Sequence, residues 1–212
     1  MGYPIPKEAL ERAQALLARK EGRLLLGIAG EPGAGKSTLA LALCEALGTK
    51  AIVVPMDGFH LANVELARLG RSARKGAPDT FDVHGYIALL ERIRRTASHQ
   101  TIYAPAFHRE IEESISGEIV VPPEVKLVIT EGNYLLLEEE PWIGVRGLLD
   151  EAWFVDVDPI QRHQQLLARH MQFGRSREEA LHWIDSSDEP NARRIKATAP
   201  RADYCISWNT SS

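Results

Sequence analysis

The stretch LLLGIAGEPGAGKST, residues 24–38, decides the fold. Its second part matches the spacing G-x-x-x-x-G-K-[ST] at every fixed position, with Gly30, Gly35, Lys36 and Ser37. The apolar run before the motif predicts a buried strand, and the segment STLALALCEAL after it predicts a helix. This order of strand, loop and helix predicts a phosphate-binding loop, because the setting gives the motif its meaning. The alternative is a glycine-rich turn with an incidental lysine.

The predicted loop would bind the phosphates of a nucleotide through its backbone. Glycines allow a tight turn whose N–H groups point inward, and the next helix adds unpaired donors and the positive end of its dipole. Lys36 supplies a positive charge for the outer phosphates, and the Ser37 hydroxyl is a candidate Mg²⁺ ligand. The candidate phosphate-binding residues are Gly30, Gly33, Ala34, Gly35, Lys36, Ser37 and Thr38.

The composition is that of an ordinary globular chain, with 44% hydrophobic and 25% charged residues among 212. A net charge of −4 provides no broad basic field for nucleic acid or an acidic membrane, and no apolar run reaches the length of a membrane span. Cys44 and Cys205 show no metal-binding spacing. The N-terminus lacks the layout of a secretory signal, so we expect a cytoplasmic protein.

The order of the expected elements predicts an α/β fold in one domain over residues 1–212. Apolar strands are expected at 24–29, 51–56, 125–132, 151–158 and 203–208. Helices are expected at 6–20 and 85–95, a charged helical region at 159–196, and a loop at 67–82. Two short strands, TIYAPAF and GEIVV, predict a hairpin around HREIEESIS. Apolar strands that alternate with helices predict a parallel sheet covered on both faces.

Three carboxylates follow predicted strands, where the chemistry of open α/β sheets collects. They are Asp57, Glu131 and Asp158. Phosphoryl transfer to an alcohol needs an acceptor for the hydroxyl proton and an acid that holds Mg²⁺, and Asp57 and Glu131 are the natural pair for these roles. Asp158 precedes Pro159 and equally fits a helix N-cap.

Arginines are concentrated after the strand expected at 151–158. The segment IQRHQQLLARHMQFGRSREEA contains Arg162, Arg169, Arg175 and Arg177. Arginine meets the charge of a transferring phosphoryl group well, because it is forked and permanently charged. The cluster, followed by Gly174, is typical of a lid that closes over donor phosphates. A solvated basic helix surface is the alternative for each single arginine.

Six segments in order resemble the phosphoribulokinase/uridine kinase family of P-loop kinases: GEPGAGKST, VPMDGFH, RKGAPDTFD, APAFHRE, VITEGNYLL and VDVDPIQRHQQLLARH. The resemblance extends over residues 24–208, and bacterial P-loop pantothenate kinase is similar as well. Within the family, the chain is similar to the bacterial branch identified as fructose kinases. The resemblance implies a three-layer P-loop NTPase fold, parallel sheet flanked by helices, with a helical lid at about 159–190 and a small β-hairpin at about 101–121.

The resemblance also implies roles for single residues, with ATP and Mg²⁺ as cofactors. Asp57 matches the catalytic aspartate, which accepts the proton of the attacking hydroxyl, while Lys36 and Arg169 neutralise charge as it shifts. Ser37 and Glu131 match the metal-supporting positions. Phe107, His108 and Arg109 fall on the acceptor side, Phe107 where uridine kinases place an aromatic residue against the base. The implied substrate residues are Asp57, His60, Phe107, His108, Arg109 and Glu131.

The sequence differs from the family's uridine and pantothenate kinases at features that bear on the phosphate acceptor. Uridine kinases carry an acid two residues before the proline of the P-D-x-F-D stretch, and this chain has Gly76 there. The chain also lacks the long N-terminal extension of the pantothenate enzymes. A small sugar such as fructose is therefore expected, with uridine, cytidine or pantothenate as alternatives and a regulatory NTPase without an alcohol acceptor as a further one. A homodimer is compatible with the sequence, and Asn191 and Arg194 are candidates for adenine contacts.

Overall fold

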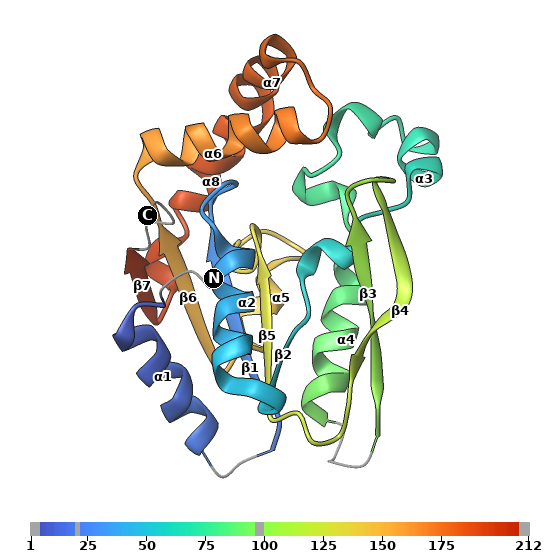
Figure 1. Cartoon of the computed structure of the whole chain (residues 1–212). Helices are drawn as coiled ribbons and strands as arrows, with labels where there is room; N and C mark the ends of the chain where they lie inside the picture. The colour runs from blue at the N-terminus through green and yellow to red at the C-terminus, as the bar shows by residue number, and fades with distance from the viewer. Residues whose placement is uncertain (1–4, 20–21, 96–99, 208–212) are drawn as a thin grey trace.

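The computed structural model describes residues 5–19, 22–95 and 100–207, and its centre is a five-stranded parallel sheet (Figure 1). The strand order is β2-β5-β1-β6-β7. The strands are β1 (Leu24–Gly30), β2 (Ala51–Val53), β5 (Leu127–Gly132), β6 (Glu151–Asp156) and β7 (Tyr204–Ser207). The parallel α/β sheet predicted from the sequence is confirmed.

Helices cover both faces of this sheet. The helices are α1 (Lys7–Ala18), α2 (Lys36–Leu47), α3 (Asn63–Arg68), α4 (Val83–Arg95), α5 (Ile143–Arg146), α6 (Pro159–Gln172), α7 (Arg177–Trp183) and α8 (Glu189–Lys196). Figure 1 shows α6 and α7 beyond the carboxyl ends of the strands, above the loop that joins β1 to α2. The predicted lid segment therefore lies at the edge of the sheet where active sites of α/β proteins form.

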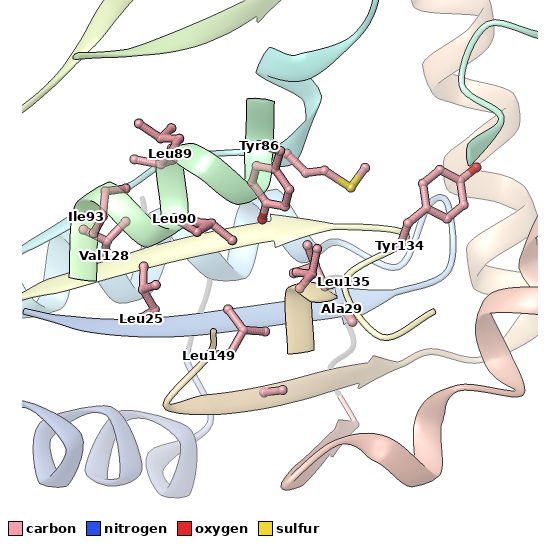
Figure 2. Close-up of a cluster of buried hydrophobic side chains, with 14 of the residues drawn as sticks. Leu25, Ala29, Tyr86, Leu89, Leu90, Ile93, Val128, Tyr134, Leu135 and Leu149 are labelled. Carbon is pink, nitrogen blue, oxygen red and sulfur yellow. The ribbon is translucent and has the colours of Figure 1, made fainter. Parts of the chain in front are cut away.

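The central strand β1 is buried on both faces, which explains its unbroken apolar sequence. Leu24, Leu26 and Ile28 pack with apolar residues of α1 and α2 on one face. Leu25 packs on the other face with the apolar side of α4, including Leu90 (Figure 2). Successive side chains of a strand point to opposite faces, so a continuous run of apolar residues satisfies two helical layers at once.

Two consecutive buried hydrogen bonds connect α4, β5 and the residue after β2. The Tyr86 hydroxyl donates to Thr130 Oγ1 at 2.6 Å, and Thr130 donates in turn to the Val54 carbonyl oxygen at 2.7 Å. Each polar atom in these two hydrogen bonds has a partner, so its burial carries little cost. The hydrogen bonds hold the end of β5 beside the segment that follows β2, and both segments lead into the candidate site.

The hairpin forms a separate two-stranded antiparallel sheet, β3 (Ile102–His108) and β4 (Glu113–Val121). The predicted second strand, 117–121, was too short, and most of the predicted connection belongs to the strands. His108 pairs with Glu113 and Phe107 with Ser114, so only four residues form the turn. Cross-strand pairing, which the polar sequence HREIEESIS does not reveal, extends the sheet to its tip.

Several other helix and strand boundaries also differ from those expected from the sequence. Strand β2 ends at Val53, earlier than predicted, because Pro55 has no N–H for a sheet ladder. The expected loop at 67–82 contains the end of α3 and short 3₁₀ turns. The charged helical region divides into α6, α7 and α8, with a single π-helical turn at 184–188. Residues 20 and 208, at the ends of a predicted helix and a predicted strand, lie outside the described residues.

Among the described residues, no helix has the length and apolar character needed to cross a membrane.

Candidate active site

The loop between β1 and α2 has the backbone of a phosphate-binding loop. Gly33 and Gly35 have φ angles of 81° and 82°, in the left-handed region that favours glycine. Gly35 is the N-cap of α2, so the free N–H groups of the first helical turn face the loop. A Cβ on Gly33 would lie 2.7 Å from Leu166 Cγ of α6, so the loop and α6 are in close contact.

Lys36 and Ser37, the last two fixed positions of the motif, have partners in the loop itself and at the end of β5. The Lys36 ammonium donates to the Glu31 carbonyl oxygen at 3.0 Å and to Asn133 Oδ1 at 2.7 Å. Burial lowers the pKa of Lys36 to about 8, against the opposing effect of the carboxylates of Glu131 and Asp57. The Ser37 hydroxyl donates to Glu131 Oε1 at 2.9 Å.

The two predicted acids lie on adjacent segments of the sheet edge. Asp57 stands in a 3₁₀ turn, Met56–Phe59, directly after β2. Glu131 is the penultimate residue of β5 and only 6% exposed. Burial and the charge of Asp57 raise the pKa of Glu131, and Lys36 opposes this. A guanidinium from the hairpin, Arg109 Nη2, lies 3.2 Å from Asp57 Oδ2.

The third carboxylate, Asp158, is a helix N-cap. Its Oδ1 accepts hydrogen bonds from the backbone N–H groups of Ile160 at 2.9 Å and Gln161 at 3.1 Å. Pro159 occupies the first helical position, where its missing N–H costs nothing. Of the two interpretations that the sequence left open for Asp158, the structure supports the structural one.

The arginines of the predicted lid separate into three groups. Arg169 and Arg175 line the cavity that also contains Lys36 and Asp57. Burial and the nearby charge of Arg109 lower the pKa of Arg169. Arg162 faces the phosphate loop instead, where it pairs with Glu31, and its side chain is 4% exposed. Arg177 is exposed at the start of α7 and does not line the cavity.

Arg175 is held by neighbours within the predicted lid segment. Its guanidinium lies 4.2 Å above the ring of Trp183, and Nη1 is 2.6 Å from His170 Nδ1. The other ring nitrogen of His170 is 2.7 Å from Asp188 Oδ2. Because arginine only donates, Nδ1 of His170 is the acceptor and Nε2 carries the proton given to Asp188. These contacts bind the end of α6 to α7 and to the π-helical turn.

The predicted acceptor side of the cavity is lined by aromatic and cationic side chains. The ring of His60 lies between those of Phe81 and Phe107, with centroid distances of 4.0 and 4.6 Å. Burial lowers the pKa of His60 to about 4, so the ring is neutral near pH 7. The Lys75 ammonium lies 5.3 Å from the Phe107 ring centroid, and the Arg109 guanidinium lies 6.0 Å from it.

The fold brings most of the predicted site residues to one cavity of about 610 Å³. The predicted residues that line it are Lys36, Ser37, Asp57, His60, Phe107, Arg109, Glu131 and Arg169. The remaining phosphate-loop residues, Gly30, Gly33, Ala34, Gly35 and Thr38, are not among the lining residues, and their predicted contribution is through backbone N–H groups. Asn191 lines the cavity, whereas Arg194 pairs with Glu139.

His108 is the predicted substrate residue that the structure does not bring to the cavity. Its Nε2 lies 2.6 Å from Glu118 Oε2 across the hairpin, and this carboxylate raises the pKa of the exposed imidazole. His108 and Arg109 are consecutive, yet only Arg109 turns toward Asp57. Sequence neighbours at a strand end point in opposite directions, so only one of the two reaches the cavity.

Sequence reasoning missed Asn133 and Lys75, which also line the cavity. Asn133 stands two residues beyond Glu131, at the carboxyl end of β5, and this position was the available signal. Lys75 donates to Asn63 Oδ1 at 2.6 Å and contacts the Glu112 carbonyl oxygen at the hairpin tip. Its contact with the hairpin depends on the tertiary fold and has no local signature.

Ser37 and Glu131 fit a Mg²⁺ site of the kind used with nucleotides. They offer a hydroxyl and a carboxylate 2.9 Å apart, hard oxygen donors of the type that Mg²⁺ prefers. Within residues 5–19, 22–95 and 100–207 there is no cluster of three or more His, Cys, Asp or Glu that could hold a metal alone. Mg²⁺ in kinases is bound through one or two side chains plus substrate phosphates, so such a sparse donor set is appropriate.

Comparison with known proteins agrees with this geometry. The model of the phosphoribulokinase / uridine kinase family matches residues 25–209. The chain belongs to this family. This kinase is 34% identical over 210 residues to the Schizosaccharomyces pombe protein "Putative uridine kinase C227.14", covering 94% of this chain and 88% of the relative.

Two further relatives differ in the acceptor that their names state. The crystal structure of a "putative fructose transport system kinase" from Silicibacter sp. TM1040 has a TM-score of 0.84 and 34% identity, over 96% of this chain and 100% of that one. The pantothenate kinase of Lacticaseibacillus casei is 31% identical over 151 residues, 68% of this chain and 48% of the relative. The kinase is an ATP-dependent phosphotransferase with a hydroxyl acceptor, as its family indicates, and the predicted P-loop kinase fold is confirmed.

Proposed function

We propose that this kinase transfers the γ-phosphoryl group of ATP to a hydroxyl of a small sugar, with fructose as the first candidate. The observation that carries the proposal is the convergence of Lys36, Asp57, Glu131 and Arg169 on one cavity. Cations for the phosphoryl charge and a carboxylate for the hydroxyl proton thus share one site, as in-line transfer requires. The relative from Silicibacter, with 34% identity over nearly the whole chain, supports the choice of a sugar.

Asp57 accepts the proton of the acceptor hydroxyl in this proposal. Asp57 lies in the turn after β2, and Arg109 Nη2 of the hairpin donates a hydrogen bond to its Oδ2 at 3.2 Å. Lys36 and Arg169 neutralise the charge of the transferring group, while Ser37 and Glu131 would hold Mg²⁺, which would supply further positive charge to the phosphates. Most of the rate comes from positioning and from electrostatic stabilisation of the transition state.

The acceptor wall supports a polyol more than an extended apolar ligand. Lining residues on this side offer hydroxyl, amide and charged groups: Asn63, Ser72, Lys75, Arg109, Glu110 and Glu112. Such groups hydrogen-bond a ligand that carries several hydroxyls, and a missing hydroxyl would leave a polar group unpaired. The neutral His60 ring and Phe107 add a flat surface, which a nucleoside base would also use.

Uridine and pantothenate remain the competing acceptors, because relatives with 34% and 31% identity carry these names. A screen of ADP release decides among them, with fructose, other hexoses and pentoses, uridine, cytidine and pantothenate each added to enzyme, ATP and Mg²⁺. The proposal predicts stimulation by a sugar and a phosphorylated sugar as the product. Stimulation by a nucleoside or by pantothenate alone would replace the sugar, and slow hydrolysis that no alcohol accelerates would favour a regulatory NTPase.

A further inference from the structure

Asn133 is a cavity residue to which neither the loop motif nor the proposed acceptor chemistry assigns a role. It follows β5 directly after Gly132 and is the closest side-chain partner that the ammonium of Lys36 has, at 2.7 Å from Oδ1. Lys36 makes its second hydrogen bond to a backbone carbonyl, that of Glu31. The amide therefore shares the immediate surroundings of the lysine that meets the outer phosphates of a nucleotide.

The orientation of this amide follows from the chemistry of its partner. A lysine ammonium only donates hydrogen bonds, so the atom of Asn133 that faces Lys36 must be the oxygen. The amide nitrogen, Nδ2, then lies on the opposite branch of the side chain. Within the described part of the chain, Nδ2 donates to no protein acceptor, and the residue lines the cavity beside Lys36. Two N–H donors are thus available for a ligand.

We propose that Asn133 is a catalytic residue whose Nδ2–H donates to a non-bridging oxygen of the γ-phosphoryl group during transfer. In the step itself, a bond forms between the acceptor oxygen and the γ-phosphorus, and the bond from that phosphorus to the β–γ bridging oxygen breaks. The acceptor proton passes to Asp57 and ADP leaves with the electron pair of the broken bond. Asn133 stays a neutral amide throughout and supplies only hydrogen bonds, which strengthen as charge spreads over the equatorial oxygens.

A neutral amide suits this position for an electrostatic reason. Glu131, two residues earlier, and Asp57 already place two carboxylates near Lys36, and a further one there would repel the triphosphate. An amide offers an acceptor to Lys36 and a donor to the phosphoryl group without adding charge. The inference rests on the kinase reaction of the family and on Lys36 meeting the outer phosphates, and it holds for any hydroxyl acceptor.

The competing role is structural, with Asn133 only holding Lys36 in the nucleotide-free enzyme. Nucleotide binding without an acceptor separates the two roles. Calorimetry with the whole chain and Mg²⁺ gives the dissociation constants of ADP and of the β,γ-imido analogue of ATP, and the ratio reports contacts to the γ-phosphoryl group. Intrinsic ATP hydrolysis gives turnover with water as the acceptor, so the result does not depend on which sugar is used.

For Asn133→Ala, the proposal predicts an unchanged affinity for ADP, about tenfold weaker binding of the imido analogue and about 10²-fold slower hydrolysis. Asn133→Asp keeps an oxygen for Lys36 but loses both donors and adds a negative charge, so it should weaken binding of both nucleotides and weaken that of the imido analogue more. Equal losses for both nucleotides, or no loss in either variant, would overturn the proposal. Thermal melting of each variant identifies unfolding, and Asn133→Leu, whose side chain has no N–H or O–H, provides a second donor-free variant if the alanine chain does not fold.

Discussion

Arg162 of α6 is buried against Glu31 of the phosphate loop, with Nε 3.5 Å from Oε1. The same guanidinium contacts Glu189 at the start of α8. Together with the packing of Gly33 under Leu166, this pairing fixes the first half of α6 on the phosphate loop. Any closure of the predicted lid over the nucleotide therefore involves the part of the segment beyond Leu166, which contains Arg169 and Arg175.

Replacing Arg162 by Met should lower the free energy of unfolding by about 3 kcal/mol, because it removes the paired cation from the buried Glu31 and the half-buried Glu189. Burial already raises the pKa of Glu31, and Arg162 opposes that rise. Urea denaturation without nucleotide measures the loss. The exposed pair of Arg68 and Glu65 provides the control, since Arg68→Met should change stability little. A loss in Arg162→Met no greater than in Arg68→Met would contradict the pairing.

Asp57→Asn should reduce kcat by about 10²- to 10⁴-fold, because the amide cannot accept the hydroxyl proton. The affinity for ATP should stay within about twofold, since Asp57 is assigned to the acceptor and not to the nucleotide. Steady-state kinetics and calorimetry with ATP check the two parts separately. Asp79→Asn is the matched control, at an exposed carboxylate outside the cavity lining. Normal turnover in Asp57→Asn would refute the assigned role.

Arg169→Met should lower kcat by about 10²- to 10³-fold, because the variant loses a cation aimed at the developing phosphoryl charge. The structure offers Arg177→Met as a control in the same lid segment, since Arg177 is exposed and outside the cavity lining. Kinetics with saturating ATP and acceptor measure both. If the two variants lose activity equally, the loss reflects the charge of the lid as a whole and the specific role of Arg169 is wrong.

The buried His60 should make folding stability depend on pH between about 4 and 6.5. Its side chain is 9% exposed, and burial lowers its pKa from 6.5 to about 4. In this window the unfolded chain binds a proton at His60 and the folded chain does not, so stability rises with pH and falls on acidification. The full difference amounts to about 3 kcal/mol.

His60→Gln removes this contribution, so its unfolding free energy should change less with pH than that of the wild-type chain. The comparison uses denaturation curves at several pH values between 4 and 7. His84→Gln, at an exposed position of α4, should retain the wild-type dependence. Parallel pH profiles for His60→Gln and the wild-type chain would show that His60 titrates alike in both states.

The sequence predicted the phosphate loop and the parallel sheet correctly because both depend on contiguous residues. Residues 30–38 contain the whole motif, and the apolar run of β1 is a local pattern that requires burial on both faces. Asp57 and Glu131 were identified because parallel strands bring their carboxyl ends to one edge. The hairpin was predicted in the right place, but its strands were predicted too short, since strand pairing at its tip is a cross-strand property.

The sequence by itself therefore determined the fold class and the loop motif, and it supplied the residue types proposed for the transfer chemistry. The tertiary structure decided which side chains meet. It brings Arg109 to Asp57 across 52 positions and Asn133 to Lys36 across 97, and it turns His108 away toward Glu118. Such choices depend on strand register and on the direction of single side chains, and a shift of one residue in a strand reverses them.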